Sequence, residues 1–213
     1  VILRGGSEAI HSNKILGKIL QDVLKRKGLP TAAITIIPTT DRKAMVEMLK
    51  LSTLIDIIIP RGGEGLMKFV GEHSKIPVIK HDKGVCNIYV DESAEIAMAV
   101  RIIQNAKVQR PGVCNAVENV VVHQNVANQL LPRLKNVLEN DQVELRGDPL
   151  SRKIIDIKAA KESDWSTEYL ELILSIRIVK NIDEAISFCR KYGSLHSEAI
   201  LTNNQENAEK FIR

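Results

Sequence analysis

Apolar residues along the chain form two alternating patterns, short continuous runs and stripes with helical spacing. Continuous runs are typical of strands buried on both faces of a parallel sheet, and the stripes indicate amphipathic helices between them. In the first part these patterns predict, in order, a short buried strand at 1–3, a helix at 12–28, a strand at 32–38, a helix at 41–49, a strand at 54–60, a helix ending near 72 and a strand at 76–80. We expect Ser12 and Asp41 to cap the first two helices, and Gly28 with Pro30 to end the first.

The same alternation continues in the second part. It predicts a strand at 86–90, a helix at 93–106, a strand at 119–123, a helix at 126–138, a strand at 142–147, a short helix capped by Asp148, a strand at 169–179, a helix at 183–192 capped by Asp183, a strand at 197–202 and a final helix. Residues 158–167 are polar and predict a loop. Regular strand and helix alternation is typical of an α/β fold with right-handed crossovers. We place a soft boundary between two lobes, 1–88 and 89–213.

Composition narrows the class of protein. The 213 residues are 44% hydrophobic, enough for a substantial core, and the formal charge is +4 with 3% aromatic residues. Nucleic-acid binding is not expected, because it needs clustered cations or stacking platforms. No apolar run approaches the roughly 20 residues that cross a bilayer, so we expect no membrane partner. Three widely spaced cysteines argue against a disulfide framework and a metal site, and indicate a reducing, cytoplasmic compartment.

The two ends of the chain are apolar or helical in pattern. Val1 begins directly on an apolar stretch, and the sequence stops at Arg213 within an apparent helix. Domain edges are usually polar and loosely held. We therefore expect the chain to be part of a longer protein.

Cys114 is the first candidate for chemistry. It stands after the helix breakers Pro111 and Gly112, at the tip of a connection between a predicted helix and a predicted strand. Unpaired backbone N–H groups in such a turn stabilise a thiolate and can hold an oxyanion. Lys107 and Arg110 lie nearby in sequence and add positive potential. Cys114 is either a nucleophile or a small buried apolar residue.

The other titratable candidates carry weaker signals. Cys86 and Cys189 fall on apolar elements and are interpreted as structural. Glu118 is a possible general base by its sequence distance from Cys114, and His196 stands before a strand but is most simply a solvated loop residue. The histidines show no spacing typical of metal ligands.

Two glycine loops follow predicted strands. Arg4, Gly5 and Gly6 form one, and Arg61 with Gly62 and Gly63 forms the other. Glycine at the carboxyl end of a parallel strand lets a phosphate approach backbone N–H groups, and an arginine fork suits phosphate. Each loop alone is equally compatible with a simple turn, and the dinucleotide fingerprint G-x-G-x-x-G is absent. Together the loops favour a phosphorylated cofactor.

Four segments carry a resemblance to a known family. They are NAKVQRPGVCNAVENVVVH at 105–123, IIPRGGEGL at 58–66, GVCNIYVDESAEI at 84–96 and KYGSLHSEAILTNNQENAEKF at 191–211. With these motifs in order, the chain resembles the gamma-glutamyl phosphate reductases, also called glutamate-5-semialdehyde dehydrogenases, a proline-biosynthesis branch of the aldehyde dehydrogenase superfamily. The resemblance implies an aldehyde dehydrogenase-like α/β fold, with part of a Rossmann-like cofactor lobe before a catalytic lobe.

The resemblance also implies a reaction. Such enzymes convert L-glutamyl 5-phosphate to L-glutamate 5-semialdehyde with NADPH and release phosphate, with a cysteine thioester as the intermediate. By the same resemblance, Cys114 is the nucleophile, Arg4, Gly5 and Gly6 lie near the adenosine ribose, Gly62 and Gly63 lie near the cofactor, and Glu168 contacts the nicotinamide ribose. No metal is implied. A homo-oligomer and a functional link to glutamate 5-kinase are compatible with this family.

Some positions depart from the family pattern. Lys80 stands where hydrolytic aldehyde dehydrogenases place a water-activating glutamate, and Asn87 stands where the branch often has histidine. The resemblance implies that segments before Val1 and after Arg213 complete the site, so we expect the 213 residues alone to be inactive. The alternatives are an inactive remnant or interaction module of this family, and an aldehyde dehydrogenase with a different acyl acceptor.

Overall fold

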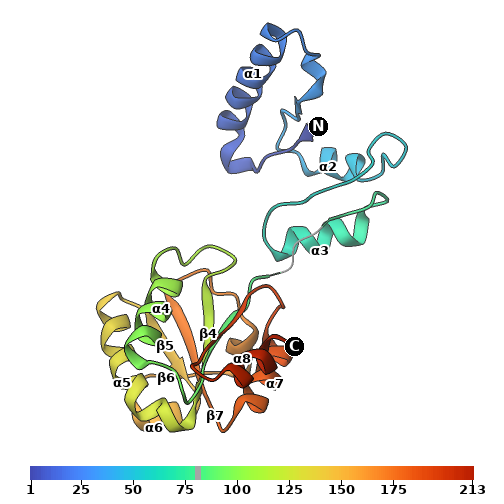
Figure 1. The fold of residues 1–213 in the computed structure, drawn as a ribbon. Helices are drawn as coiled ribbons and strands as arrows, with labels where there is room; N and C mark the ends of the chain where they lie inside the picture. The colour runs from blue at the N-terminus through green and yellow to red at the C-terminus, as the bar shows by residue number, and fades with distance from the viewer. Residues whose placement is uncertain (80–82) are drawn as a thin grey trace. The chain divides into compact units, whose positions relative to one another are not determined.

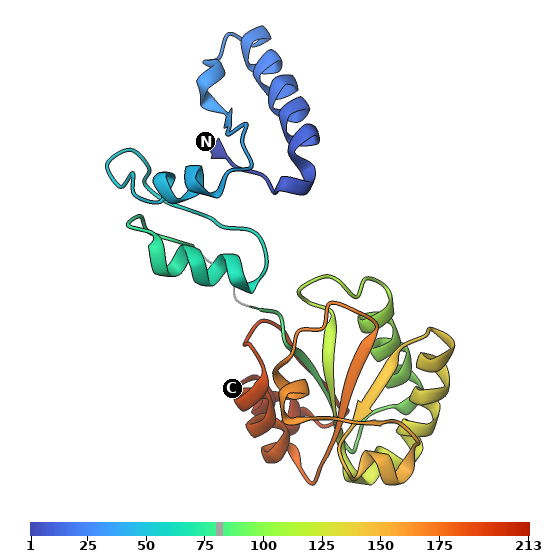
Figure 2. The same cartoon turned by 180° about the vertical axis from the view of Figure 1, so that it is seen from behind.

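Residues 1–79 and 83–213 are described by the computed structural model of the chain, which divides into two units, Val1–His81 and Asp82–Arg213 (Figure 1 and Figure 2). The boundary differs from the expected division between residues 88 and 89. That division would cut the strand Cys86–Val90, whose hydrogen-bonded neighbours all belong to the second unit. Strand pairing therefore places the boundary earlier in the sequence.

The described part of the first unit contains a small parallel sheet and three α-helices. Its elements are β1 (Ile2–Leu3), α1 (Ile10–Arg26), β2 (Thr35–Ile36), α2 (Arg42–Met48) and α3 (Glu64–His73), with 3₁₀ turns at Ser7–Ala9 and Thr31–Ala33. The two strands run parallel, with Ile2 opposite Thr35. Asp41 caps α2 as predicted, because its Oδ1 accepts a hydrogen bond from the Lys43 N–H at 2.8 Å. Gly28 has a φ of 69° just after α1, which ends the helix there.

Several predictions in this unit were wrong. The strand predicted at 54–60 is reduced to one parallel bridge between Ile58 and Val78. The same bridge replaces the described part of the strand predicted at 76–80, whose residue 80 lies outside the described residues. Ser12 lies inside α1, whose N-cap is Ala9. The strand at 1–3 was predicted to be buried, yet Ile2 is 50% exposed. A strand is buried on both faces only when layers cover both sides, and this sheet has two short strands.

The second unit is a six-stranded parallel sheet covered by helices on both faces. Its elements are β3 (Cys86–Val90), α4 (Ile96–Val108), β4 (Val117–His123), α5 (Gln124–Asn140), β5 (Glu144–Gly147), α6 (Ser151–Ile154), β6 (Lys158–Ala159), β7 (Ile173–Val179), α7 (Ile182–Tyr192), β8 (Glu198–Leu201) and α8 (Gln205–Ile212), with a 3₁₀ helix at Glu162–Ser166. The strand order is β6-β5-β7-β4-β3-β8. Helices α4, α5 and α6 cover one face, and α7 and α8 cover the other (Figure 1). The predicted α/β class is confirmed.

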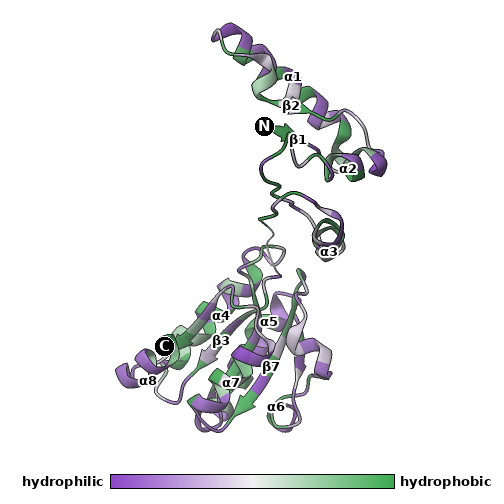
Figure 3. Cartoon of the chain, turned by 90° about the vertical axis from the view of Figure 1, so that its right-hand side faces the viewer, coloured by the Kyte–Doolittle hydropathy of each residue, from purple (hydrophilic) through white to green (hydrophobic). Residues whose placement is uncertain are grey.

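Two apolar layers hold this unit together. The larger layer lies between the sheet and α4 and α5, and contains Val120, Ile176 and Leu134 among its fully buried side chains. The smaller layer joins Tyr89 and Val121 to α7 and to Trp165, Phe188 and neighbouring residues. Hydrophobic residues occur in the strands and on parts of the helices, and hydrophilic residues are prominent on helices such as α8 (Figure 3). Among the described residues, no helix combines the length and the apolar character needed to span a bilayer.

Details at element ends in this unit also differ from the predictions. Residues 158–167 were predicted as a loop but contain β6 and the 3₁₀ helix, which buries Asp164 and Trp165. Asn181, rather than Asp183, caps α7 by accepting from the Glu184 N–H at 3.0 Å. Glu95 caps α4, so this helix begins later than residue 93. Asp148 was predicted to cap α6, whose N-cap is Leu150, and its Oδ1 instead accepts from the Ser151 N–H at 2.9 Å in the turn that leads into the helix.

A row of polar side chains crosses the whole sheet. The paired positions are Lys158 on β6, Arg146 on β5, Ser175 on β7, Asn119 on β4, Asn87 on β3 and Glu198 on β8. Asn119 Nδ2 donates to Asn87 Oδ1 at 2.9 Å, and Asn87 Nδ2 donates to Glu198 Oε1 at 3.0 Å. Burial raises the pKa of Glu198 to about 7, although the hydrogen bond from Asn87 opposes this shift.

This pKa predicts how stability depends on pH. A carboxyl with a raised pKa favours the folded state below its unfolded pKa of about 4.3, and the contribution is lost as the pH rises through about 7. Glu198→Gln cannot ionise. As the pH rises from about 5 to about 8, the unfolding free energy of wild type should therefore fall relative to that of Glu198→Gln. The expected change is on the order of 1 kcal/mol after discounting for partial exposure. Urea unfolding at several pH values measures this change, with Glu171→Gln at an exposed position as the control. A difference that does not change with pH would contradict the prediction.

Candidate active site

Cys114 lies on an exposed turn between α4 and β4, as its sequence context predicts. The turn is short and closed by backbone hydrogen bonds, from Val113 N–H to Arg110 O at 3.4 Å and from Ala116 N–H to Val113 O at 3.0 Å. The thiol is thus presented to solvent on a bent backbone segment. This arrangement suits a nucleophile better than a core residue.

The amino ends of the parallel strands bring three other connections to the Cys114 turn. The segments before β3, β7 and β8 carry Gly84, Glu168 and His196 respectively. Val85 joins two of these segments, since its N–H donates to Ser194 Oγ at 2.9 Å. The structure thus places Glu168, His196 and Cys114 at the amino ends of the strands, although each comes from a different connection.

The backbone of Cys114 is held closely by the strand beside it. A Cβ atom at Gly84 would lie 1.9 Å from the Cys114 carbonyl oxygen, so only glycine permits this approach. Cys86 Sγ donates to the same oxygen at 3.1 Å. His196 Nδ1 lies 3.8 Å from the Cys86 sulfur and belongs to an exposed side chain. These contacts fix the main chain of Cys114 while leaving its side chain accessible.

The remaining cysteines are structural, as predicted. Cys86 and Cys189 are both buried. Burial raises the pKa of Cys86 to about 11 and that of Cys189 to about 12, and Glu198 adds to both shifts. Neither thiol therefore ionises readily at neutral pH.

Lys107 and Glu118 do not play the roles that the sequence suggested. Lys107 Nζ lies 2.7 Å from Glu118 Oε2, and both side chains are completely buried. The expected positive potential from Lys107 at Cys114 is wrong, because the charge is paired within the core. Glu118 is likewise engaged by Lys107 and by the Leu170 N–H at 3.4 Å, which does not fit a general base acting on Cys114. Burial raises the pKa of Glu118 to about 7 and lowers that of Lys107.

The predicted cofactor residues of the first unit lie in two loops. Arg4 follows β1, its Nη2 donates to Thr40 O at 3.2 Å, and its Nε is buried without a protein partner. Gly5 and Gly6 continue from Arg4. Gly62 has a φ of 156°, and Gly63 is the N-cap of α3 with no side chain capping the helix. The first backbone N–H groups of α3 thus have no side-chain cap. Lys80 lies outside the described residues.

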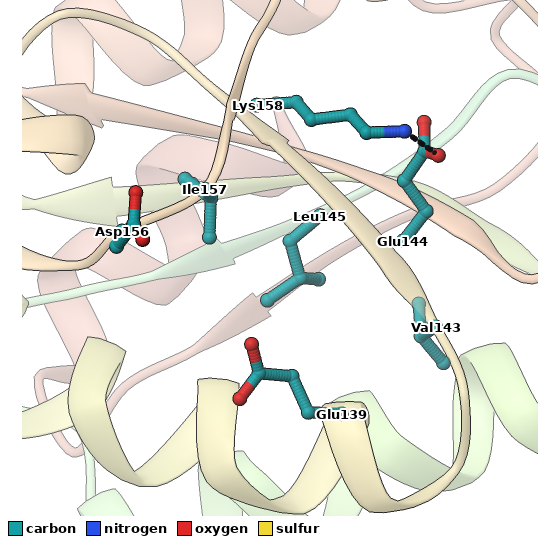
Figure 4. A pocket seen from close by; sticks show the side chains of 7 residues that line it. All are labelled: Glu139, Val143, Glu144, Leu145, Asp156, Ile157 and Lys158. Carbon is teal, nitrogen blue, oxygen red and sulfur yellow. Dashed lines mark hydrogen bonds and ion pairs between the residues drawn. The ribbon is translucent and has the colours of Figure 1, made fainter.

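One cavity of about 400 Å³ lies away from these candidates, at the edge of the sheet. Its lining comes from the end of α5 and from β5, β6 and their connection: Glu139, Val143, Glu144, Leu145, Asp156, Ile157 and Lys158 (Figure 4). Glu144 is already paired with Lys158 and Arg146. No predicted site residue lines this cavity, so it does not define the active site.

Sequence reasoning missed the contacts beneath Cys114. The sequence around Gly84 and Cys86 shows only a glycine just before an apolar strand, a pattern that does not predict contact with Cys114. The Lys107–Glu118 pair had a clearer signal, since a lysine occupies a core position of α4 and a glutamate interrupts the apolar pattern of β4. Charged residues at core positions are seldom buried unless they are paired.

Comparison with known proteins identifies the family. The aldehyde dehydrogenase family matches residues 1–155. The chain belongs to this family. Within it, gamma-glutamyl phosphate reductases closely resemble the chain: 54% identity over 214 residues for the protein of Geotalea daltonii, and 47% over 214 residues for that of Xanthomonas campestris pv. campestris. Each match covers 100% of this chain and 51% or 52% of the relative. The chain spans about half the length of the curated relatives that it matches.

Solved structures support the same assignment of family and fold. The crystal structure of gamma-glutamyl phosphate reductase from Thermotoga maritima matches with a TM-score of 0.94 and 45% identity, covering 99% of this chain and 51% of that one. An acetylating aldehyde dehydrogenase from Geobacillus thermoglucosidasius matches with a TM-score of 0.74, 22% identity, and 99% and 55% coverage. The second likeness shows the fold alone. The resemblance proposed from the sequence motifs is confirmed.

The close approach of Gly84 to Cys114 yields a prediction. In wild type, iodoacetamide should label exposed Cys114 before buried Cys86 and Cys189. Gly84→Ala forces the Cys114 carbonyl to move and should change the labelling rate of Cys114 by about 10-fold or more, with a loss of stability of about 1–3 kcal/mol.

The matched control for this experiment is Gly112→Ala in the Cys114 turn. Its added Cβ would meet nothing nearer than the Leu170 carbonyl oxygen at 3.7 Å, an ordinary contact. Labelling is followed by mass spectrometry of the three cysteine peptides. Equal labelling rates in the two variants would show that the approach of Gly84 does not control Cys114.

Proposed function

We propose that this chain carries the nucleophile and part of the cofactor site of an NADPH-dependent gamma-glutamyl phosphate reductase, which reduces L-glutamyl 5-phosphate to L-glutamate 5-semialdehyde. The observation that carries the proposal is the exposed Cys114 thiol on a turn with a fixed main chain. The identity of 47–55% to proteins of that name supports the substrate. The relatives are about twice as long, so the complete activity is proposed for the full-length protein.

In this proposal Cys114 attacks the acyl carbon of the substrate. The sulfur forms a thioester bond while the bond from carbon to the phosphate oxygen breaks, and phosphate leaves as a stable anion. The negative charge that develops on the carbonyl oxygen needs N–H donors, and the bent backbone of the Cys114 turn supplies one. Bound NADPH supplies the hydride that reduces the thioester carbon. The thiol is released when the carbon–sulfur bond of the reduced adduct breaks to give the aldehyde.

The first unit fits a phosphorylated dinucleotide. Arg4 offers a buried Nε with no protein partner, and Thr40 O holds its Nη2, so the guanidinium is oriented before a ligand arrives. The start of α3 at Gly63 offers backbone N–H groups without a side-chain cap. We infer that Arg4 meets the 2′-phosphate, that Gly5, Gly6, Gly62 and Gly63 permit close approach of the cofactor, and that Glu168 holds the nicotinamide ribose.

Loss of the nucleophile should abolish the reaction. In the full-length protein, Cys114→Ser should reduce turnover by about 10³-fold or more, because an alcohol is a far weaker nucleophile than a thiol at neutral pH. NADP⁺ binding should stay within a few-fold of wild type. Turnover is measured in the reverse direction, as NADP⁺ reduction with glutamate 5-semialdehyde and phosphate. Cys189→Ala, on α7, is the control and should retain activity. If Cys114→Ser still reduced NADP⁺, the assignment of Cys114 would be refuted.

Cofactor preference tests the proposed role of Arg4. Wild type should prefer NADPH over NADH, and Arg4→Ala should reduce that preference by about 10–100-fold, since a hydrogen-bonded charge pair contributes about 1.5–3 kcal/mol. The ratio of kcat/KM for the two cofactors measures this effect. Arg26→Ala is the control, because the Arg26 Nε donates to Asp22 O within its own helix. Unchanged discrimination in Arg4→Ala would exclude contact with the 2′-phosphate.

A further inference from the structure

A completely buried ion pair closes the base of the Cys114 turn. Lys107 lies in the last turn of α4 and Glu118 near the start of β4, and the residues between them include the whole turn. Their Nζ and Oε2 atoms are 2.7 Å apart, and neither side chain is exposed. The pair therefore fixes the two points at which the turn leaves and re-enters the fold.

Glu118 also connects this turn to the segment that carries Glu168. Its second oxygen, Oε1, accepts from the Leu170 N–H at 3.4 Å. Leu170 has a φ of 57°, a conformation that side-chain-bearing residues rarely adopt without support. The Leu170 carbonyl oxygen in turn lies beside Gly112, 3.7 Å from where a Cβ would be. One carboxylate thus holds the helix end through Lys107 and the strained Leu170 segment through its N–H.

Stability alone gives a weak reason for this pair. Removing two charges from water costs several kcal/mol per ion, and apolar residues of similar volume often replace a buried pair without loss of stability. Of the charged groups near the pair, Glu168 opposes the charge on Glu118, whereas Lys107 favours it. Burial and the like charge of Glu168 both act against the charge on Glu118, so the pair is costly if stability is its only role.

We propose that Glu118, held by Lys107, is a positioning residue that sets the Cys114 turn in register with the Leu170 segment. The inference rests on the proposed function, in which Cys114 is the nucleophile and Glu168 lies at the cofactor. Glu118 touches neither substrate nor cofactor in this role. It acts through the Leu170 N–H, so that the Cys114 thiol stays at a fixed distance from Glu168, the proposed contact of the nicotinamide ribose. Misplacement of reacting groups by about 1 Å can cost about 10²-fold in rate.

Two double variants separate positioning from stability. Lys107→Met/Glu118→Leu, the apolar double variant, replaces the pair with apolar side chains and leaves the Leu170 N–H without an acceptor. Lys107→Met/Glu118→Gln, the amide double variant, also removes both charges but keeps a carbonyl oxygen for the Leu170 N–H. Lys210→Met, which breaks an exposed pair with Asp183, is the control for loss of a lysine. Each full-length variant is compared with wild type in thermal midpoint, Cys114 alkylation by iodoacetamide, and the kcat and KM of NADP⁺ reduction by glutamate 5-semialdehyde and phosphate.

We expect the apolar double variant to lose about 10–100-fold in kcat with KM within about twofold, as misplacement of a group used in the chemical step predicts. The amide double variant should stay within about threefold of wild type in kcat at a similar thermal midpoint. Equal kcat values in the two double variants, or kcat values that follow the thermal midpoints, would overturn the inference. If wild type itself shows no turnover, the proposed function fails. Unequal alkylation of Cys114 in the two double variants would then still support positioning, and equal alkylation would refute it.

Discussion

Every strand pairing in the larger sheet is parallel, and the arrangement of the candidate site depends on this constraint. Parallel strands place all their amino ends on the same side of the sheet, so connections that are distant in sequence meet there. Cys114 and Gly84 are 30 residues apart in the numbering, and Glu168 is a further 54 residues on, yet their connections all lie at the amino ends of the strands. The site is thus assembled by topology, and no single local motif contains it.

Close contacts from the segment that leads into β3 hold the main chain of Cys114. The absence of a side chain at Gly84 lets β3 approach the Cys114 carbonyl, and a buried thiol that stays protonated donates to that oxygen. Below the turn, the only fully buried lysine among the described residues is neutralised by Glu118. The local charge at Cys114 therefore differs from what its sequence neighbours suggest. Exposed Arg110 remains in the turn, whereas Lys107 belongs to the core.

The sequence predicted an element correctly where the local residue pattern determines its burial. It failed where burial or pairing depends on tertiary contacts. The run Val120–Val122 is buried on both faces of a central strand, and it was predicted correctly because continuous apolar character has one common explanation there. Residues 54–60 have the same character, but among the described residues their pairing is limited to the bridge between Ile58 and Val78, which no local pattern reveals. Asn181 and Asp183 are both good caps, and the choice between them depends on helix geometry. The exposed turn of Cys114 was predictable, whereas the pairing of Lys107 required tertiary structure.

The polar row across the six strands has a consequence for folding. Because side chains alternate between the faces of a strand, a slip of one residue at β3 or β4 would turn Asn87 or Asn119 into the apolar layer of α4 and α5. It would also break their amide hydrogen bond and leave polar groups buried without partners. Strands made of Val and Ile alone would tolerate such a slip far better. The row therefore selects one register of the strands. Hydrophobic burial alone would also stabilise sheets in other registers, but those sheets would leave these polar groups without partners.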